Sequence, residues 1–427
     1  MPTIKQLFHI PPALKNNRRY AMYWAGLLIS NTGSQMQVWA IFWHLRVLSD
    51  DPIVVSGIGI AKFVPILLFA LIGGLVADTF DRRRVVLITQ TCMILIATAL
   101  GLLTYFGHIQ LWHMYVLVAI QGIAVSFDGP SRQSMVPAIV PREDLPSAFG
   151  LQSIAADVGA VVGPALCGLV IATLGLQWIY WINAVSFLAV IIALINMGPI
   201  PSPRSLNVNK AMNPFKRLNF AEIPAGIRFI MGHPIILSSM LLDFFATFFS
   251  SANTLMPFIA TDVLHTDAIG YGWLSAAQSI GAVTVALFMA QANGVRKQGK
   301  LLLWGVGAFG VATAVFGLSR NYALTMLALI VVGAGDAIST VLRNTIRQLQ
   351  TPDEMRGRMV SINQIFFAGG PQLGEVEAGI VASTLGTPFA IISGGIGCVI
   401  AVLFTAFRYP ALRNYNGDEE VLAGAKG

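Results

Sequence analysis

The stretch GGLVADTFDRRRVVLI, from Gly73 to Ile88, breaks a long apolar run with Asp78, gathers four more charged residues at 81–84, and then becomes apolar again. Only 11% of the 427 residues are charged and 55% are hydrophobic, whereas roughly a quarter of the residues in a soluble domain carry a charge. We therefore expect a membrane protein, in which this stretch is a polar turn between two membrane spans.

Apolar runs long enough to cross about 30 Å of hydrocarbon as helices recur along the whole chain. The first run is too long for a signal peptide, and no small-residue cleavage site follows it. The predicted fold class is all-α and integral to the membrane, with twelve transmembrane helices at 22–48, 53–77, 85–106, 111–134, 149–174, 177–197, 235–259, 269–290, 301–318, 322–342, 359–384 and 387–408.

The distribution of basic residues predicts the orientation of the chain. Nearly all of the 27 Lys and Arg fall on the side of the membrane that holds the charged turn, the exceptions being Arg320, Arg46 and Lys62. The positive-inside rule makes that side cytoplasmic and puts both termini there. The net charge of +7 then faces anionic membrane lipids, and nucleic acid is not expected as a partner.

The residues that carry redox, metal or nucleotide chemistry form no pattern. Cys92, Cys167 and Cys398 all lie within expected spans, and the six His are scattered. No Gly-x4-Gly-Lys-Ser/Thr phosphate loop is present. We expect no disulfide framework, no metal, no cofactor and no enzymatic activity.

The longest polar interruption, 198–234, divides the twelve expected spans into six and six. SRQSMVPAIVPRE (131–143) aligns without gaps to LRNTIRQLQTPDE (342–354), so that Arg132 matches Arg343 at an offset of 211 residues. Gly122 matches Gly333 at the same offset. This indicates a duplication, and parallel repeats of this kind place a transporter's substrate site between them.

The predicted domains follow from the duplication. An N-terminal six-helix bundle covers 1–197, and a C-terminal six-helix bundle covers 235–427. The segment between them, 198–234, is expected to be a cytoplasmic linker that ends in a short amphipathic helix, NFAEIPAGIRFIM.

Twelve spans, a six-plus-six repeat and a charged turn between spans two and three resemble the major facilitator superfamily over the whole chain. The family's turn reads Gly-x-x-x-Asp-Arg-x-Gly-Arg-Arg, and here Thr79 replaces an Arg and Asp81 replaces a Gly. The resemblance implies two pseudo-symmetric helical bundles and transport by alternating access. The matching positions are Gly74, Asp78, Arg82 and Arg83.

Span five resembles a signature of the superfamily's exporters and antiporters, Gly-x8-Gly-x3-Gly-Pro-x2-Gly-Gly. It reads GLQSIAADVGAVVGPALCG, with Cys167 in place of one Gly. Residues without bulk let helix backbones approach closely, and a proline inside the helix permits bending. The alternative is that Gly is simply common in membrane helices. The motif residues are Gly150, Gly159, Gly163, Pro164 and Gly168.

Two further stretches indicate which branch of the major facilitator superfamily the chain resembles. Gln121-Gly122 fits another antiporter motif, but Val118 stands where that motif has an Arg, so no proton-coupling role follows from it. ADTFDRRRV and the LGEVEAG of span eleven resemble the enterobactin-exporter-like branch, which borders the macrolide exporters. This resemblance implies a drug or a siderophore-like solute.

The charged turn has two interpretations. In the first, Arg82 to Arg84 only anchor the topology, as any basic loop does. In the second, Asp78 caps a helix end that faces the other half, and Arg82 pairs with Asp78 and with Asp128. Such a conformational latch would hold the cytoplasmic side closed in one state and release it in the other.

Ionisable side chains within the spans are the second group of candidates, because they normally face a partner or a water-filled cavity. Burial disfavours the charged form of a carboxylic acid, which suits a carrier that exchanges protons. Arg46 and Lys62 are the candidate charge partners, and a purely structural ion pair is the alternative. The candidates for proton coupling are Asp243 and Glu375, followed by Asp157 and Asp336.

Span one carries the candidate substrate face. Asn31, Gln35, Trp39 and Trp43 recur every four residues, which aligns them along one helical stripe. A stripe that grades from amide to indole suits an amphipathic, partly aromatic solute. The alternative for Trp43 is an interfacial anchor.

Together these patterns predict a monomeric carrier in the inner membrane of a bacterium. It exports a small amphipathic solute by alternating access in antiport with protons, and its partners are the small-molecule substrate, protons and membrane lipids. One alternative is a nutrient importer or facilitator of the same fold, which differs in the direction of transport. The other is a membrane enzyme, which would need a His/Asp or Ser/His constellation that the sequence does not show.

Overall fold

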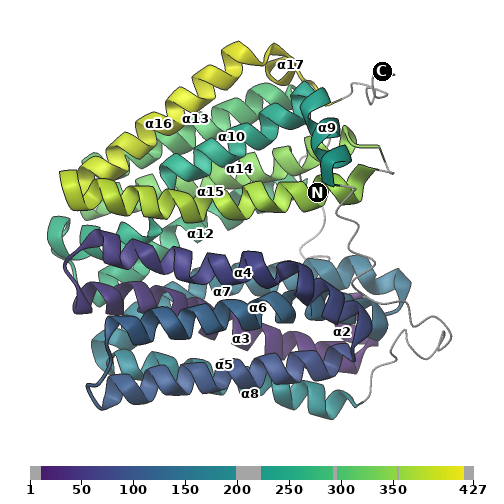
Figure 1. The fold of residues 1–427 in the computed structure, drawn as a ribbon, viewed down its shortest axis with the longest axis vertical. Coiled ribbons are helices and arrows are strands. Elements are labelled where there is room, and N and C mark those ends of the chain that lie inside the picture. Colours follow the sequence, from purple (N-terminus) through teal and green to yellow (C-terminus); the bar gives the residue numbers. More distant parts are fainter. Residues whose placement is uncertain (1–10, 199–222, 292–295, 353–354, 418–427) are drawn as a thin grey trace, which may run out of the picture. The chain divides into compact units, whose positions relative to one another are not determined.

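The chain is built of helices, and no strand occurs in the part that the computed structural model describes, residues 11–198, 223–291, 296–352 and 355–417. Long helices joined by short connections run alongside one another (Figure 1). The expected all-α fold is confirmed. The N-terminal half contains α2 (Pro12–Asn16), α3 (Arg18–Leu48), α4 (Pro52–Thr79), α5 (Arg82–Tyr105), α6 (Leu111–Ile139), the 3-10 turn η1 (Arg142–Asp144), α7 (Leu145–Thr173) and α8 (Leu176–Met197).

The C-terminal half has the same construction, preceded by a short helix at the end of the expected linker. Residues 199–222 of that linker lie outside the described residues. The elements are α9 (Ile223–Gly232), α10 (Pro234–Ser250), η5 (Asn253–Leu255), α11 (Met256–Phe258), η6 (Ile259–Val263), α12 (Ala268–Gln291), α13 (Gln298–Leu318), α14 (Tyr322–Leu349), α15 (Arg356–Leu385), α16 (Thr387–Arg408) and α17 (Pro410–Arg413).

The helices gather into two compact units. The first unit comprises residues 1–44 and 64–217, and the second comprises 45–63 and 218–427. The end of α3 and the first part of α4 therefore belong to the second unit.

The charged turn of the sequence is the break between α4 and α5. The Asp81 carboxylate accepts hydrogen bonds from the backbone N–H groups of Arg83 (3.0 Å) and Arg84 (3.4 Å). An acidic residue at this position satisfies N–H groups that have no partner inside the helix. Asp81, which departs from the family's turn, thus starts the third long helix.

In the first unit α5 packs against both α6 and α8, and α3 is fastened to α7 by its aromatic residues. The Tyr20 hydroxyl donates to the Ala148 carbonyl (2.6 Å), and the Trp24 indole donates to the Leu151 carbonyl (2.6 Å). Tyrosine and tryptophan bury a large apolar ring while their polar atom keeps a partner. These bonds fix the position of α3 on α7.

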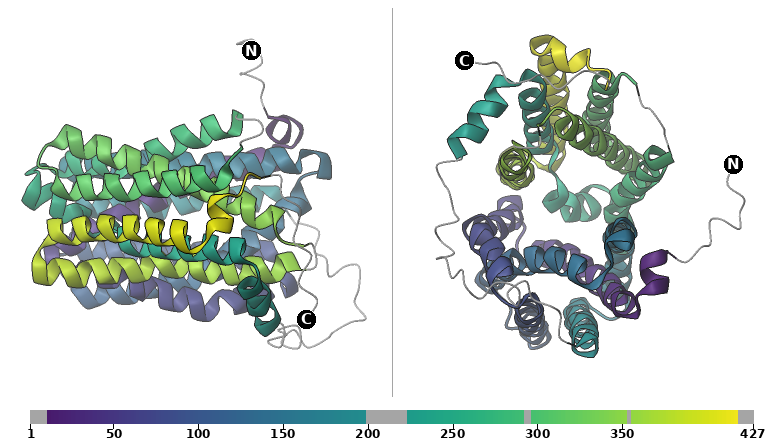
Figure 2. Two further views of the ribbon diagram at one scale, coloured as in Figure 1. Left: turned by 90° about the horizontal axis from the view of Figure 1, so that it is seen from above. Right: turned by 90° about the vertical axis from the view of Figure 1, so that its right-hand side faces the viewer.

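In the second unit α13 packs against α14 and α16, and α10 packs against α15 and α16 (Figure 2). A close approach joins α12 to α14, where a Cβ atom at Gly333 would overlap the Gln278 carbonyl oxygen. Only a glycine admits this contact. Buried apolar residues of four helices form the core of the unit: Leu242, Leu302, Leu342, Ile346 and Cys398.

Ten helical segments of the described chain are long and apolar enough to cross a membrane. The spans expected at 22–48 and 359–384 fall in α3 and α15, helices of 31 and 30 residues that are not among those ten. The span expected at 235–259 falls in the candidate span Pro234–Val263, but its helix is interrupted after Ser250. Backbone at Ser251 is extended, and Pro257, which has no N–H to donate, follows in the second piece.

Candidate functional site

Two glycines of the span-five motif lie in the seam between α7 and α3. A Cβ atom added at Gly159 would come within 3.1 Å of the Asn31 backbone, and one at Gly163 would come within 2.6 Å of the Gln35 Cβ. A side chain at either position would push the helices apart. The amide end of the span-one stripe is therefore held against the glycine motif, within the first unit.

The remaining motif and stripe residues differ in their surroundings. An added Cβ at Gly150 would meet no atom within 4 Å, whereas Pro164 and Gly168 are buried inside α7. Trp39 is buried and Trp43 is half-buried on α3. Contact between the stripe and a solute stays a prediction.

The basic residues of the charged turn bind the carbonyl ends of helices. Arg82 donates to the carbonyl oxygens of Ala77 (3.2 Å) and Ser134 (2.7 Å), and Arg83 donates to that of Leu194 (2.9 Å). These carbonyls lie near the C-terminal ends of α4, α6 and α8, where the helix dipole concentrates negative charge. The turn thus ties together three helix ends of the first unit.

Asp128 does not pair with Arg82, contrary to expectation. It is 7% exposed and forms an ion pair with Arg132 at 2.5 Å, because residues four apart on a helix are neighbours. Its Oδ1 also accepts hydrogen bonds from Thr89 (2.7 Å) and Gln90 (3.0 Å). The carboxylate is therefore satisfied without the turn.

The two other latch positions lie on α4. The side chain of Asp78 lies outside the described residues, so its part in a latch stays a prediction. An added Cβ at Gly74 would meet nothing within 4 Å, whereas one at Gly73 would overlap the Ser126 carbonyl oxygen. The close contact of α4 with α6 thus falls one residue before the motif glycine.

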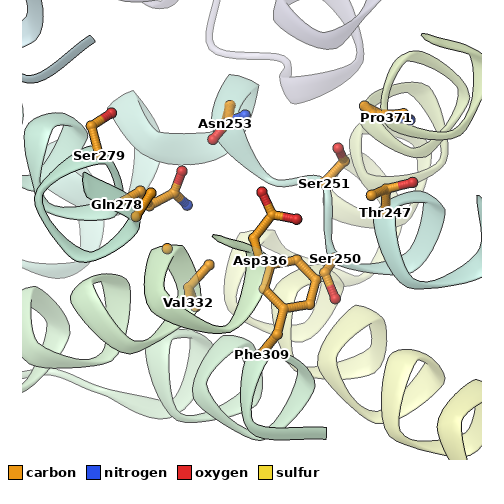
Figure 3. Close-up of a pocket in the computed structure, with 12 residues that line it drawn as sticks. Thr247, Ser250, Ser251, Asn253, Gln278, Ser279, Phe309, Val332, Asp336 and Pro371 are labelled. Atoms are coloured by element: carbon orange, nitrogen blue, oxygen red, sulfur yellow. The ribbon is translucent and has the colours of Figure 1, made fainter. Parts of the chain in front are cut away.

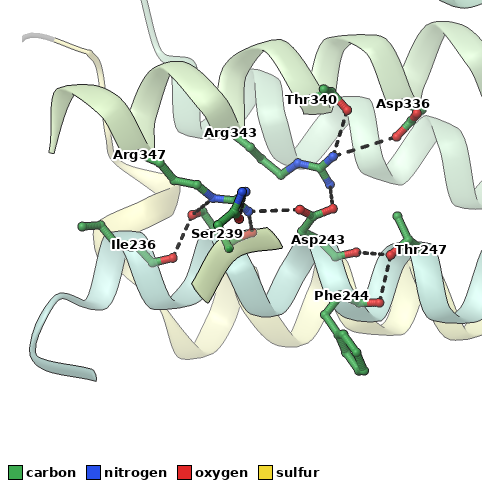
Figure 4. Close-up of polar contacts among 10 residues, drawn as sticks. Ile236, Ser239, Asp243, Phe244, Thr247, Asp336, Thr340, Arg343 and Arg347 are labelled. Carbon is green, nitrogen blue, oxygen red and sulfur yellow. Dashed lines mark hydrogen bonds and ion pairs between the residues drawn. The ribbon is translucent and has the colours of Figure 1, made fainter. Parts of the chain in front are cut away.

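Asp243 of α10 is 1% exposed and lies between two arginines of α14 (Figure 4). Its Oδ1 is 2.5 Å from Arg343 Nη1, and its Oδ2 is 3.2 Å from Arg347 Nη2. Arg347 also donates to the Ser239 carbonyl (2.8 Å) and to Asn363 Oδ1 (2.5 Å). Such bonds offset part of the cost of taking charges out of water. We call Asp243, Arg343 and Arg347 the Asp243 cluster.

Arg343 and Arg347 are absent from the residues expected at a site, because basic residues at the end of a span are taken as topology signals. Two signals could have found them. Their spacing of four residues puts them on one helix face, and Arg343 is the repeat partner of Arg132, which also neutralises a buried Asp.

A polar pocket of about 260 Å³ lies in the second unit among α10, α12, α13, α14 and α15 (Figure 3). Asp336 is the one charged residue among its described lining residues, and its side chain is 50% exposed. Asp336 Oδ1 is 3.9 Å from Arg343 Nη2, so the pocket adjoins the Asp243 cluster. The other lining residues are Thr247, Ser250, Ser251, Asn253, Gln278, Ser279, Ala282, Phe309, Val332, Gly333 and Pro371.

Arg46 pairs with acids other than those expected. It forms ion pairs with Asp50 and with Asp262, the latter at 2.9 Å, and its guanidinium lies over the Phe258 ring at 4.9 Å. All four residues belong to the second unit. Arg46 is therefore not the partner of Asp243, whose charge is met by α14.

Glu375 of α15 is 6% exposed, and the charge of Lys62 on α4 acts on it within the second unit. Neither residue has a hydrogen bond or an ion pair within 4.0 Å in the described part of the chain. A Cβ at Gly59 would come within 2.9 Å of Glu375 Oε2, so α4 packs closely over the carboxylate. Asp157, by contrast, is exposed on α7 of the first unit.

The described residues include no group of three or more His, Cys, Asp and Glu placed to hold a metal ion.

Comparison with known proteins adds to this geometry. A family model described as "Transmembrane secretion effector" matches residues 12–421. An enterobactin exporter EntS of Citrobacter koseri is 30% identical over 371 residues, which are 86% of this chain and 85% of the relative. An enterobactin exporter EntS of Escherichia coli is 30% identical over 349 residues, or 81% of this chain and 80% of the relative.

A solved structure of the nucleoside transporter NupG resembles the chain with a TM-score of 0.68 at 14% sequence identity. The match covers 93% of this chain and 99% of that one. At 14% sequence identity, this resemblance is evidence of a shared fold alone.

Proposed function

Because this chain belongs to the transmembrane secretion effectors of the major facilitator superfamily, we propose that it exports a small amphipathic solute, drug-like or siderophore-like, across the inner membrane of a bacterium. The observation that carries the proposal is the polar pocket, which sets one carboxylate, that of Asp336, inside a bundle of apolar helices. The exporter relatives and the glycine seam of span five support the outward direction.

Alternating access moves one bundle of helices against the other as a largely rigid body. Each unit has internal bonds that suit such a motion. Arg82 and Arg83 tie helix ends in the first unit, and the Asp243 cluster ties α10 to α14 in the second. We assign the switching between states to the charged turn, with Asp78 as the residue that engages and releases.

Proton antiport is the proposed source of energy, with Glu375 as the coupling residue. Asp243 is a poor candidate, because two arginines hold its charge. Glu375 is also buried but has only the charge of Lys62 to balance it. A buried carboxylate without hydrogen-bond donors is costly to keep charged. Binding or release of a proton by Glu375 therefore changes the charge of the site without breaking hydrogen bonds.

The test of function uses the full-length protein in proteoliposomes, with enterobactin as the probe. A proton antiporter moves the probe against its gradient in the direction opposite to the protons, whereas a proton-coupled importer moves it in the same direction as the protons and a facilitator does not move it against its gradient. Transport in the same direction as the protons, or only down the probe's own gradient, would refute export.

The coupling residue is tested in the same vesicles by Glu375→Gln, with Glu377→Gln as the matched control, since Glu377 is half-buried on the same helix. The first variant should lose transport driven by the pH gradient while keeping counterflow, which needs no net proton movement. The second should keep both. Full gradient-driven transport in Glu375→Gln would exclude this residue and leave Asp336 and Asp157.

We infer a monomer with both termini in the cytoplasm, where the basic residues meet anionic lipid headgroups. The asymmetry of Lys and Arg supports this orientation.

A further inference from the structure

The pocket of the second unit is polar but nearly free of charge. Its described lining combines hydroxyl and amide side chains with apolar residues, among them the aromatic ring of Phe309, and with the single carboxylate of Asp336. Figure 3 shows this carboxylate directed into the pocket, between Gln278 on one side and Ser251 on the other. A bound group therefore meets hydrogen-bond acceptors and donors from several helices at once.

The charge of Asp336 is already balanced by its surroundings. The two acids Asp336 and Asp243 face the two arginines Arg343 and Arg347, at distances from 2.5 to 3.9 Å (Figure 4). With all four groups ionised their sum is zero. Three of the four are at most 2% exposed, whereas the side chain of Asp336 is 50% exposed.

This balance selects the charge of the ligand. A cation bound at Asp336 would leave one positive charge uncompensated beside the buried arginines, and an anion would face the carboxylate directly. Both are penalised, because Asp243, Arg343 and Arg347 are buried where the effective dielectric constant is low. An uncharged group that donates a hydrogen bond leaves the net charge of the four side chains at zero. It still gains a charge-assisted hydrogen bond to the Asp336 carboxylate.

We propose that this pocket binds an uncharged, hydroxyl-bearing aromatic group of the exported solute, with Asp336 as the acceptor of the hydroxyl proton. The Phe309 ring supplies the apolar contact, and Gln278 and Asn253 supply amide hydrogen bonds to neighbouring polar atoms. The volume of about 260 Å³ is below that of sites for whole drug-sized ligands, about 300–1,000 Å³. The pocket is thus a subsite for one part of the solute, and the inference rests on the proposed function.

Arg343 acts here as a positioning residue. Its Nη2 lies 3.9 Å from Asp336 and 2.9 Å from the Thr340 hydroxyl, while its Nη1 is held by Asp243. The guanidinium therefore supplies positive charge to Asp336 without occupying the pocket. A lysine at this position keeps the charge but cannot form the same two-sided contact.

The experiment measures equilibrium binding to the full-length protein in nanodiscs, using four probes of one shape. 3-Hydroxybenzamide is neutral and donates a hydrogen bond, and 3-methoxybenzamide is neutral but does not donate from the ring. 3-(Aminomethyl)phenol is a cation, and 3-hydroxybenzoate is an anion. The first should bind at least about ten-fold more tightly than the other three, the size expected for one hydrogen bond to a charged group.

Substitutions then assign the binding to the pocket. Asp336→Asn should reduce affinity for 3-hydroxybenzamide about ten-fold and remove its preference over the methoxy compound, while Asp336→Glu restores part of it. Arg343→Gln, which removes one positive charge from the sum, should weaken the rejection of the cationic probe, and Arg343→Lys, which keeps the charge, should preserve that rejection. Glu377→Gln, outside the pocket lining, should match the wild type for all four.

Equal affinities for all four probes, or tightest binding of the cation, would overturn the inference. So would an unchanged preference in Asp336→Asn. These outcomes are independent of the export assay. Export of enterobactin without selectivity among the probes would refute the subsite and leave the proposed function standing, and selective binding without any transport would do the reverse.

Discussion

The guanidinium of Arg343 lies 2.5 Å from the carboxylate of Asp243, and both side chains are almost completely buried. This pair joins α10 to α14 at a depth where neither charge can be satisfied by water. Arg347 completes the arrangement from one helical turn further along. The stability of the second unit should therefore depend on all three groups being present.

Replacement of Asp243 by Asn should destabilise the protein by about 3–5 kcal/mol, because it leaves two buried guanidinium groups without a counter-charge. Asp262→Asn is the matched control. Asp262 pairs with Arg46 but its side chain is 48% exposed, so its loss should cost about 1 kcal/mol or less. Thermal unfolding in detergent measures both, and equal melting temperatures for the two variants would contradict the role assigned to the cluster.

Alanine at two positions of the span-five motif should have opposite effects. Gly163→Ala places a Cβ within 2.6 Å of the Gln35 Cβ and should cost about 1–3 kcal/mol through overpacking. Gly150→Ala meets open space and should stabilise α7 by about 0.5–1 kcal/mol, since alanine is the better helix former. Melting temperatures that shift in the same direction would show that the glycine seam is not tightly packed.

Substitutions of Arg83 and of its neighbour Arg84 test whether hydrogen bonds from the turn to helix ends stabilise the protein. Arg83→Gln removes a charged donor from the Leu194 carbonyl and should cost about 1–2 kcal/mol. The Arg84 side chain is 82% exposed and lies 3.6 Å from Asp81, so Arg84→Gln should change stability by about 0.5 kcal/mol at most. A larger loss in the Arg84 variant would mean that charge in the turn matters more than its hydrogen bonds.

Neutralising Asp78 should slow transport while leaving binding of the probe measurable, because the proposed switch lies in the charged turn. Asp81→Asn removes a charge from the same turn but keeps a good helix cap, and should transport at close to the wild-type rate. Flux into proteoliposomes and probe titration are compared in both variants. Wild-type flux in Asp78→Asn would show that the charge of Asp78 serves only as a topology signal.

The orientation is testable with single cysteines in a variant that lacks Cys92, Cys167 and Cys398. A cysteine at 217 should be shielded from an impermeant reagent in intact cells, and one at 320 should be labelled. Permeabilised cells provide the control for reactivity at both sites. Equal labelling of the two from outside would exclude the predicted topology.

The helices were largely predictable from the sequence, because a run of apolar residues in a membrane has few alternatives to a helix. The break in the seventh span was not. The apolar character of the segment continues to Val263, while the backbone leaves the helix after Ser250. Composition reports the depth of a segment in the membrane but not whether its helix is continuous.

The partners of buried charges were the least predictable feature. Sequence analysis singled out Asp243 as an isolated acid, although its counter-charges lie on α14. For Asp128 the partner is on the same helix, four residues away, where local spacing could have shown it. The difference is physical, since i,i+4 neighbours are fixed by helix geometry and partners on other helices depend on packing register.

The binding of helix ends by Arg82 and Arg83 also constrains how the first unit can be assembled during synthesis. The acceptors of Arg82 lie on α4 and α6, and the acceptor of Arg83 lies near the end of α8. The hairpin of α4 and α5 can therefore insert early, but the Arg83 side chain lacks its acceptor until residue 194 has left the ribosome and entered the membrane. A chain truncated before α8 should leave the Arg83 side chain without this bond, so the first unit should be less stable at that length than in a chain that includes Met197.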